Sequence, residues 1–153
     1  GVLADVDPDR ASLYRHRASV LGDRLAALAN ALDPRFERVR NLPFVSAHRA
    51  YGHLEARFAL TGLGALTRSD ESLPTARGVG DMYSLIRERN VRCVFTEPHY
   101  QPRAVMALAR DTGARTVLLD PLGGAVPEGP DQYFILMETL AGQMIGCLAE
   151  TRD

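Results

Sequence analysis

Residues 91–120 read VRCVFTEPHYQPRAVMALARDTGARTVLLD and contain a strand–helix–strand pattern. The apolar run at 91–96 predicts a buried strand, and the spacing of apolar residues over 102–113 predicts a helix. A second apolar run at 115–119 predicts another strand, which ends at Asp120. Strands that alternate with helices of this length are typical of α/β proteins with a mostly parallel sheet.

The rest of the chain extends this pattern in both directions. Leucines and valines at helical spacing predict one long amphipathic helix from about Pro8 to Leu32, with Asp7 as its N-cap and its end near Asp33-Pro34. We therefore expect a linker helix over 1–33 and an α/β domain over 34–153, a small sheet flanked by helices. Further strands are predicted at 44–46 and 63–66, and further helices at 50–58, 74–90 and 131–149.

The composition and charge of the chain exclude several classes of protein. The chain has 153 residues, of which 46% are hydrophobic and 24% charged, as in ordinary globular domains. A net charge of −1 gives no field that would attract nucleic acid or an anionic membrane. No apolar run reaches the roughly 20 residues that a transmembrane helix needs. Because residues 1–4 do not resemble a native start, we expect a fragment of a longer protein.

Polar side chains follow three of the predicted strands. His48 follows the strand at 44–46, Glu97 follows the strand at 91–96, and Asp120 follows the strand at 115–119. Ligands of open α/β sheets bind at the carboxyl ends of the strands, and His and Asp are both zinc ligands. The three segments predict a possible metal site, although hydrogen-bonded loop residues would give the same pattern.

The other histidines are weaker candidates. His53 lies five residues after His48 and lacks the i, i+4 spacing of a helical metal clamp, so we expect it on the surface. His16 lies among arginines of the long helix and is expected to be solvated, and His99 is a loop residue near the site. Neither a phosphate-binding loop nor a nucleophile elbow is present in the sequence.

The two cysteines, Cys93 and Cys147, allow two interpretations. They are too few and too widely spaced for a zinc ribbon or a redox Cys-x-x-Cys pair. They are either buried thiols that act as small hydrophobic residues, or one disulfide, which would place the protein outside the cytosol.

Four segments, in order, resemble those of zinc-specific solute-binding proteins of ABC importers. Residues 44–55 (FVSAHRAYGHLE) are similar to that family's His-Asp-Ala-Tyr-Gly-Tyr-Phe-Glu stretch, although Arg49 replaces its usual aspartate. Residues 91–98 resemble its Cys-Val-Phe-x-Glu-Pro segment, 119–123 its Leu-Asp-Pro-Leu-Gly metal loop, and 146–148 its terminal cysteine.

The resemblance implies a two-lobed periplasmic protein, not an enzyme, with a long helix joining the lobes and Zn²⁺ held between them. This chain would be the C-terminal lobe, and its partners would be zinc, the missing N-terminal lobe and a membrane permease, with no role for nucleic acid. His48 and Asp120 match metal ligands, and Cys93 and Cys147 match a disulfide. Imidazole at His48 favours zinc, because manganese-carrying relatives have a carboxylate there.

Two other functions are kept as alternatives. One is a metal-dependent α/β hydrolase that uses His48 and Asp120, although no general base is evident in the sequence. The other is an adhesin-like structural module that binds a metal, because relatives of these binding proteins are described as surface adhesins.

Overall fold

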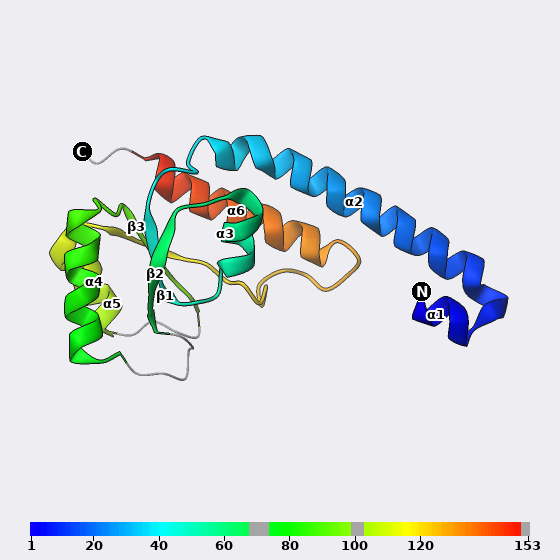
Figure 1. Cartoon of the computed structure of the whole chain (residues 1–153), viewed down its shortest axis with the longest axis horizontal. Helices are drawn as coiled ribbons and strands as arrows, with labels where there is room; N and C mark the ends of the chain where they lie inside the picture. Colours follow the sequence, from blue (N-terminus) through cyan, green and yellow to red (C-terminus); the bar gives the residue numbers. More distant parts are fainter. Residues whose placement is uncertain (68–73, 99–102, 151–153) are drawn as a thin grey trace. The chain divides into compact units, whose positions relative to one another are not determined.

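The structure is a computed structural model and describes residues 1–67, 74–98 and 103–150 (Figure 1). The chain divides into two compact units, Gly1–Pro34 and Arg35–Asp153. Each unit is described by itself.

The first unit begins with a short helix, α1 (Val2–Val6), and a 3-10 turn, η1 (Pro8–Arg10). The long helix α2 (Ala11–Glu37) follows. The predicted helical start at Pro8 with Asp7 at the N-cap position is present as the 3-10 turn, but the α-helix itself begins only at Ala11 and the Asp7 side chain makes no cap hydrogen bond. The Asp7 carboxylate instead accepts a hydrogen bond of 2.9 Å from the Tyr14 hydroxyl, and its Oδ2 lies 3.7 Å from Arg10 Nε. These contacts stabilise a turn ahead of α2.

The predicted end of α2 near Pro34 was wrong, because the helix continues to Glu37 with Pro34 inside it. A proline removes one backbone hydrogen bond and crowds the preceding turn, so other contacts must compensate for this loss of stability. Phe36 is fully buried, and its ring centroid lies 4.7 Å from that of Phe58. The burial of this aromatic side chain holds the last turn of α2 in helical form.

The second unit is built on a four-stranded, all-parallel sheet, which confirms the predicted α/β class. Its strands lie in the order β2-β1-β3-β4. The predicted strands are all present, as β1 (Phe44–His48), β2 (Gly62–Thr67), β3 (Cys93–Thr96) and β4 (Arg115–Leu118). The helices are α3 (Gly52–Phe58), α4 (Ala76–Glu88), α5 (Arg103–Thr112) and α6 (Gln132–Ala149).

Helices cover both faces of the sheet, with α4 and α5 on one face and α3 and α6 on the other (Figure 1). Side chains alternate between faces along each strand, so Val45 and Val94 face the α4–α5 side. They pack there with Met82, Ile86, Val105 and Leu108 in one buried cluster. On the opposite face the Phe44 and Phe95 ring centroids lie 5.1 Å apart. The central strands β1 and β3 are thus buried on both sides, as their apolar sequences predict, whereas the edge strands β2 and β4 are partly exposed.

Local sequence explains two of the helix ends. The Thr75 side chain caps α4 by accepting a hydrogen bond of 3.1 Å from the backbone N–H of Gly78. Gly113, with a φ of 72°, ends α5 in the left-handed conformation that glycine adopts without strain.

Cys93 in β3 and Cys147 in α6 form a disulfide. The structure therefore confirms the pairing that the resemblance implies and contradicts the free-thiol interpretation. The bond links α6 to an interior strand of the sheet.

Candidate metal centre

The strand order defines where a ligand would bind. β1 lies between β2 and β3, so the chain leaves β1 toward one side and returns to its other side. In doubly wound sheets the crevice at such a switch point, at the carboxyl ends of the strands, is the usual ligand site. His48 is the last residue of β1, Glu97 directly follows β3, and Asp120 follows β4 by two residues. The topology therefore brings the three predicted polar residues to one edge of the sheet.

The sheet register places His48 opposite Glu97. β1 and β3 pair Phe44 with Cys93, and the same offset, continued to the ends of the strands, pairs His48 with Glu97. Both side chains point to one face because the side-chain period of a strand is two. His48 Nδ1 lies 2.9 Å from Glu97 Oε1, and the two side chains are only 16% and 10% exposed. This is a close charge contact, and a carboxylate so near Nδ1 can orient the imidazole ring.

Tyr51 makes a second contact with the Glu97 carboxylate. Its hydroxyl donates a hydrogen bond of 3.4 Å to the same Glu97 Oε1, and the residue is only 3% exposed. Burial raises the pKa of Tyr51 far above its usual range, and the negative charges of Glu97 and Asp120 raise it further. Tyr51 is therefore a neutral hydrogen-bond donor at every physiological pH.

Asp120 organises the loop that follows β4. Its Oδ1 accepts hydrogen bonds of 3.1 Å from the backbone N–H groups of both Leu122 and Gly123, and its Oδ2 accepts one of 2.7 Å from Gly124. An ionised carboxylate has about four acceptor positions, so three backbone donors still allow one metal bond. The aspartate is thus held rigidly at the carboxyl edge by its own loop.

The remaining histidines are placed elsewhere or fall outside the description. His53 is exposed on α3, and His16 is exposed on α2, as their surface interpretation predicts. His99 lies outside the described residues. Over the described ranges 1–67, 74–98 and 103–150, no three His, Cys, Asp or Glu side chains converge closely enough to hold a metal ion. In the described part of the chain, His48, Glu97 and Asp120 thus share one edge of the sheet without forming a three-ligand cluster.

The sequence placed Glu97 at this edge of the sheet but gave it no role. Its position facing His48 depends on the register between strands that are far apart in sequence. The signal that could have pointed to it is the shared place of both residues at the ends of adjacent parallel strands.

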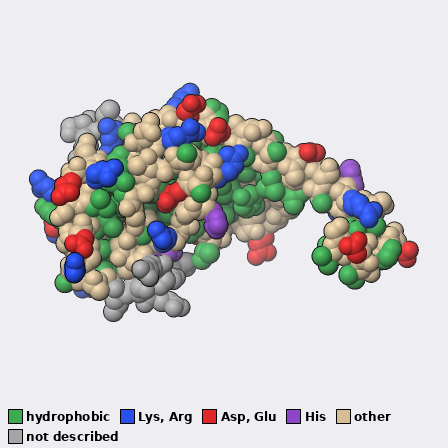
Figure 2. All heavy atoms as spheres, viewed as in Figure 1, with side chains coloured by type: hydrophobic (Ala, Val, Ile, Leu, Met, Phe, Trp, Pro, Cys, Tyr) green, Lys and Arg blue, Asp and Glu red, His purple; other side chains and the backbone are tan. Residues whose placement is uncertain are grey.

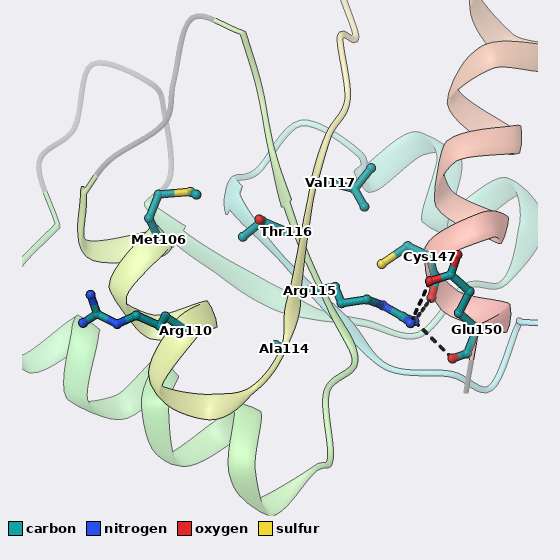
Figure 3. A pocket seen from close by; sticks show the side chains of 8 residues that line it. All are labelled: Met106, Arg110, Ala114, Arg115, Thr116, Val117, Cys147 and Glu150. Atoms are coloured by element: carbon teal, nitrogen blue, oxygen red, sulfur yellow. Dashed lines mark hydrogen bonds and ion pairs between the residues drawn. The ribbon is translucent and has the colours of Figure 1, made fainter. Parts of the chain in front are cut away.

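A separate hollow of about 460 Å³ lies along β4 and α6 (Figure 3). It is lined by residues of α5, β4 and the end of α6, among them Arg115, Cys147 and Glu150, and by none of His48, Glu97 and Asp120. The Arg115 guanidinium donates hydrogen bonds to the carbonyl oxygens of Cys147 and, at 3.1 Å, Glu150. It also forms an ion pair of 2.8 Å with the Glu150 carboxylate. The contacts of Arg115 along this hollow hold the end of α6 against β4.

The surface carries charges of both signs. Basic and acidic side chains are interspersed over the face shown in Figure 2, in keeping with the net charge of −1. Among the described residues, no helix is long and apolar enough to cross a membrane.

Known relatives share both the sequence and the fold of the chain. A high-affinity zinc uptake system protein of Brucella suis is 34% identical over 148 residues, which are 97% of this chain and 44% of the relative. The laminin-binding protein of Streptococcus agalactiae is 29% identical, with a TM-score of 0.82 over 95% of this chain and 56% of its own. A zinc(II)-bound mutant variant of the Streptococcus pneumoniae AdcAII protein is 25% identical, with a TM-score of 0.81 over 95% of this chain and 53% of its own.

The chain spans about 44% of the length of the curated zinc-uptake relatives that it matches. The family model described as zinc-uptake complex component A, periplasmic, matches residues 1–147, nearly the whole chain. This chain therefore belongs to the family of periplasmic zinc-uptake components.

Proposed function

We propose that this chain is the C-terminal lobe of a periplasmic zinc-binding protein that delivers Zn²⁺ to an ABC-type importer. The observation that carries the proposal is His48, held at the carboxyl edge of the sheet with its Nδ1 facing Glu97. A largely buried imidazole oriented by a carboxylate is a recurrent arrangement of zinc sites.

In this proposal the metal is shared between two lobes. His48 supplies a nitrogen ligand through Nε2, and Asp120 supplies one carboxylate oxygen from the end of β4. The remaining ligands come from an N-terminal lobe, and residues 1–33 belong to the helix that joins it to the lobe formed by 34–153. The match of this chain to 44% of its relatives supports such a division.

The chemistry of the ligands favours zinc over harder cations. Imidazole nitrogen suits Zn²⁺, whereas Mn²⁺, Mg²⁺ and Ca²⁺ are bound mainly by oxygen ligands. Zinc also binds more tightly than manganese to a given set of nitrogen and oxygen donors. The names of these relatives, which describe zinc uptake, agree with this preference.

Capture and release, not catalysis, is the proposed activity. The partner is a membrane permease, which receives zinc when the two lobes separate. A periplasmic location is supported by the disulfide between Cys93 and Cys147, because such bonds persist in oxidising compartments.

The test is zinc binding by the complete protein, measured by competition against a fluorescent zinc chelator. Tight binding of one zinc ion, lost by several orders of magnitude in His48→Ala, is the expected result. Retention of wild-type affinity by His48→Ala would show that this edge of the sheet is not the metal site.

An adhesive role is a second candidate, since the structural neighbour from Streptococcus agalactiae is described as bifunctional, with adhesin and metal-transporting activity. Immobilised laminin would be the probe. Saturable binding of the complete protein, unaffected by His48→Ala, would support adhesion in addition to zinc capture. Absence of binding at micromolar protein would exclude it.

A further inference from the structure

We propose that Glu97, supported by Tyr51, is a positioning residue that fixes the tautomer and ring orientation of His48 for metal binding. The inference deepens the proposed function and rests on it. It assigns a specific role to a carboxylate that does not itself bind the metal.

The backbone determines the pairing of Glu97 with His48. Both residues lie at the ends of adjacent parallel strands, and the register of the pairs from Phe44–Cys93 to Ser46–Phe95, extended by two residues, places them opposite each other. Their side chains face each other in the absence of metal, with His48 Nδ1 2.9 Å from Glu97 Oε1. Neither side chain has much freedom to turn toward solvent, since both are largely buried.

The second partner of Glu97 fixes which way its carboxylate points. The hydroxyl of the buried Tyr51 donates a hydrogen bond to the same Oε1 that faces His48 Nδ1. The Tyr51 ring is itself held edge-on to Phe95 at a centroid distance of 6.4 Å. A rigid aromatic side chain thus anchors the carboxylate, which in turn anchors the imidazole.

The electronic consequence concerns the two ring nitrogens of His48. A carboxylate beside Nδ1 stabilises the proton on that nitrogen, so the neutral ring carries its lone pair on Nε2. The negative charge also raises the basicity of Nε2 as a ligand. Partners of this kind typically contribute 10- to 100-fold to metal affinity. We expect Glu97 to contribute roughly this factor.

The first experiment observes the tautomer directly, without metal. Long-range ¹H–¹⁵N correlation spectra of the complete, zinc-free protein with ¹⁵N-labelled histidine would be recorded at about pH 8, where an ordinary histidine is neutral. The expected spectrum for His48 shows a protonated Nδ1 and an unprotonated Nε2, and Glu97→Gln should shift the ring toward the tautomer mixture of an unrestrained histidine. An Nε2-protonated His48 in the wild-type protein would overturn the proposal.

The second experiment measures zinc affinity in matched variants. Glu97→Gln keeps the shape of the side chain but removes its charge, and it should weaken zinc binding roughly 10- to 100-fold. Tyr51→Phe keeps the buried ring and should weaken binding by less than about tenfold, because Glu97 still faces His48. Glu128→Gln, on an exposed loop, is the control and should bind as the wild type does.

The outcomes separate this inference from the proposed function. If His48→Ala abolishes tight binding but Glu97→Gln leaves it at the wild-type level, the positioning role fails and the metal site stands. If His48→Ala itself has no effect, the proposed metal site fails. Thermal unfolding of each variant shows whether Glu97→Gln remains folded; if it does not, the tautomer of the wild-type protein still decides the question.

Discussion

The sulfur atoms of Cys93 and Cys147 are bonded to each other across 54 residues of sequence, so that an interior strand holds the last helix. Closing a loop of this length in the unfolded chain stabilises the native state by about 4 kcal/mol in the chain-entropy model, as an upper figure. We expect the Cys93→Ala, Cys147→Ala double variant to lose up to that free energy of unfolding. Chemical denaturation of the oxidised wild type and the double variant would measure the difference.

A thiol assay provides the direct check of the bond. The denatured, unreduced protein, prepared under oxidising conditions, should show no titratable thiol. Two thiols per chain would contradict the disulfide.

Arg115 should stabilise the same end of α6. Its guanidinium contacts the Cys147 carbonyl and both the carbonyl and the carboxylate of Glu150 (Figure 3). Hydrogen bonds from a charged donor contribute about 1.5–3 kcal/mol when well shielded, and these are partly exposed. We expect Arg115→Ala to lower the free energy of unfolding by about 1–2 kcal/mol, measured by urea denaturation.

Arg110 provides the matched control for this prediction. It lines the same hollow, but its guanidinium pairs with the exposed Asp111 at 2.9 Å. Exposed ion pairs contribute little, so Arg110→Ala should change stability by less than about 0.5 kcal/mol. Equal losses in the two variants would show that the contacts at the end of α6 are not what stabilises it.

Periodicity was enough to predict the sheet and most of its helices. The strands β1 and β3 are short apolar runs bounded by helical patterns, and burial on both faces of a parallel sheet requires such runs. Local composition failed where tertiary contacts decide the outcome. Pro34 indicated the end of α2, yet burial of Phe36 carries the helix past it.

The site was predictable only in part for a similar reason. The ends of the strands placed His48, Glu97 and Asp120 at one edge, because all parallel strands present their carboxyl ends together. The contact between His48 and Glu97 depends on the register of two strands, and no local pattern encodes a register between distant segments. The three backbone hydrogen bonds to Asp120 likewise follow from the shape of its loop.

Glu55 should make stability depend on pH. Its carboxyl group packs against Gly62, where an added Cβ would lie 2.5 Å from the Glu55 Cδ atom. Burial raises the pKa of Glu55, and the nearby positive charge of Arg49 opposes the increase. Since the folded state then binds the proton more tightly, this group's contribution to stability is present at acid pH and is lost as the pH rises through the folded pKa.

The variant Glu55→Gln removes this dependence. It should be more stable than the wild type at about pH 7, and the advantage should vanish below the ordinary glutamate pKa of about 4.3. Thermal unfolding across this pH range would measure it, with the exposed Glu88→Gln as a control. An advantage that grows toward acid pH would contradict the assigned direction of the pKa shift.

Zinc binding by the 153-residue chain alone should be weak. His48 and Asp120 supply two protein ligands, and tight zinc sites use three or four. Calorimetry should give a dissociation constant of about micromolar or weaker, with no gain of helical structure on binding. Nanomolar binding by this chain would require a further ligand in the lobe, with His53 and His99 the first to be tested.

The ligands themselves should differ in importance, and the complete protein is the place to rank them. His48→Ala deletes a strong neutral donor that water replaces poorly, so zinc affinity should fall by orders of magnitude. Asp120→Ala should cost less affinity, because water can take the place of a monodentate oxygen. The loss of its three backbone hydrogen bonds should appear separately, as reduced stability of the loop.

His53→Ala is the internal control for this ranking. The residue lies in the same segment as His48 but is exposed on α3, so its removal should leave zinc affinity nearly unchanged. Competition against a chelator of known affinity would order the three variants on one scale. If His53→Ala proved as damaging as His48→Ala, the assignment of the ligand within this segment would be wrong, and the orientation of α3 relative to the metal would have to change on binding.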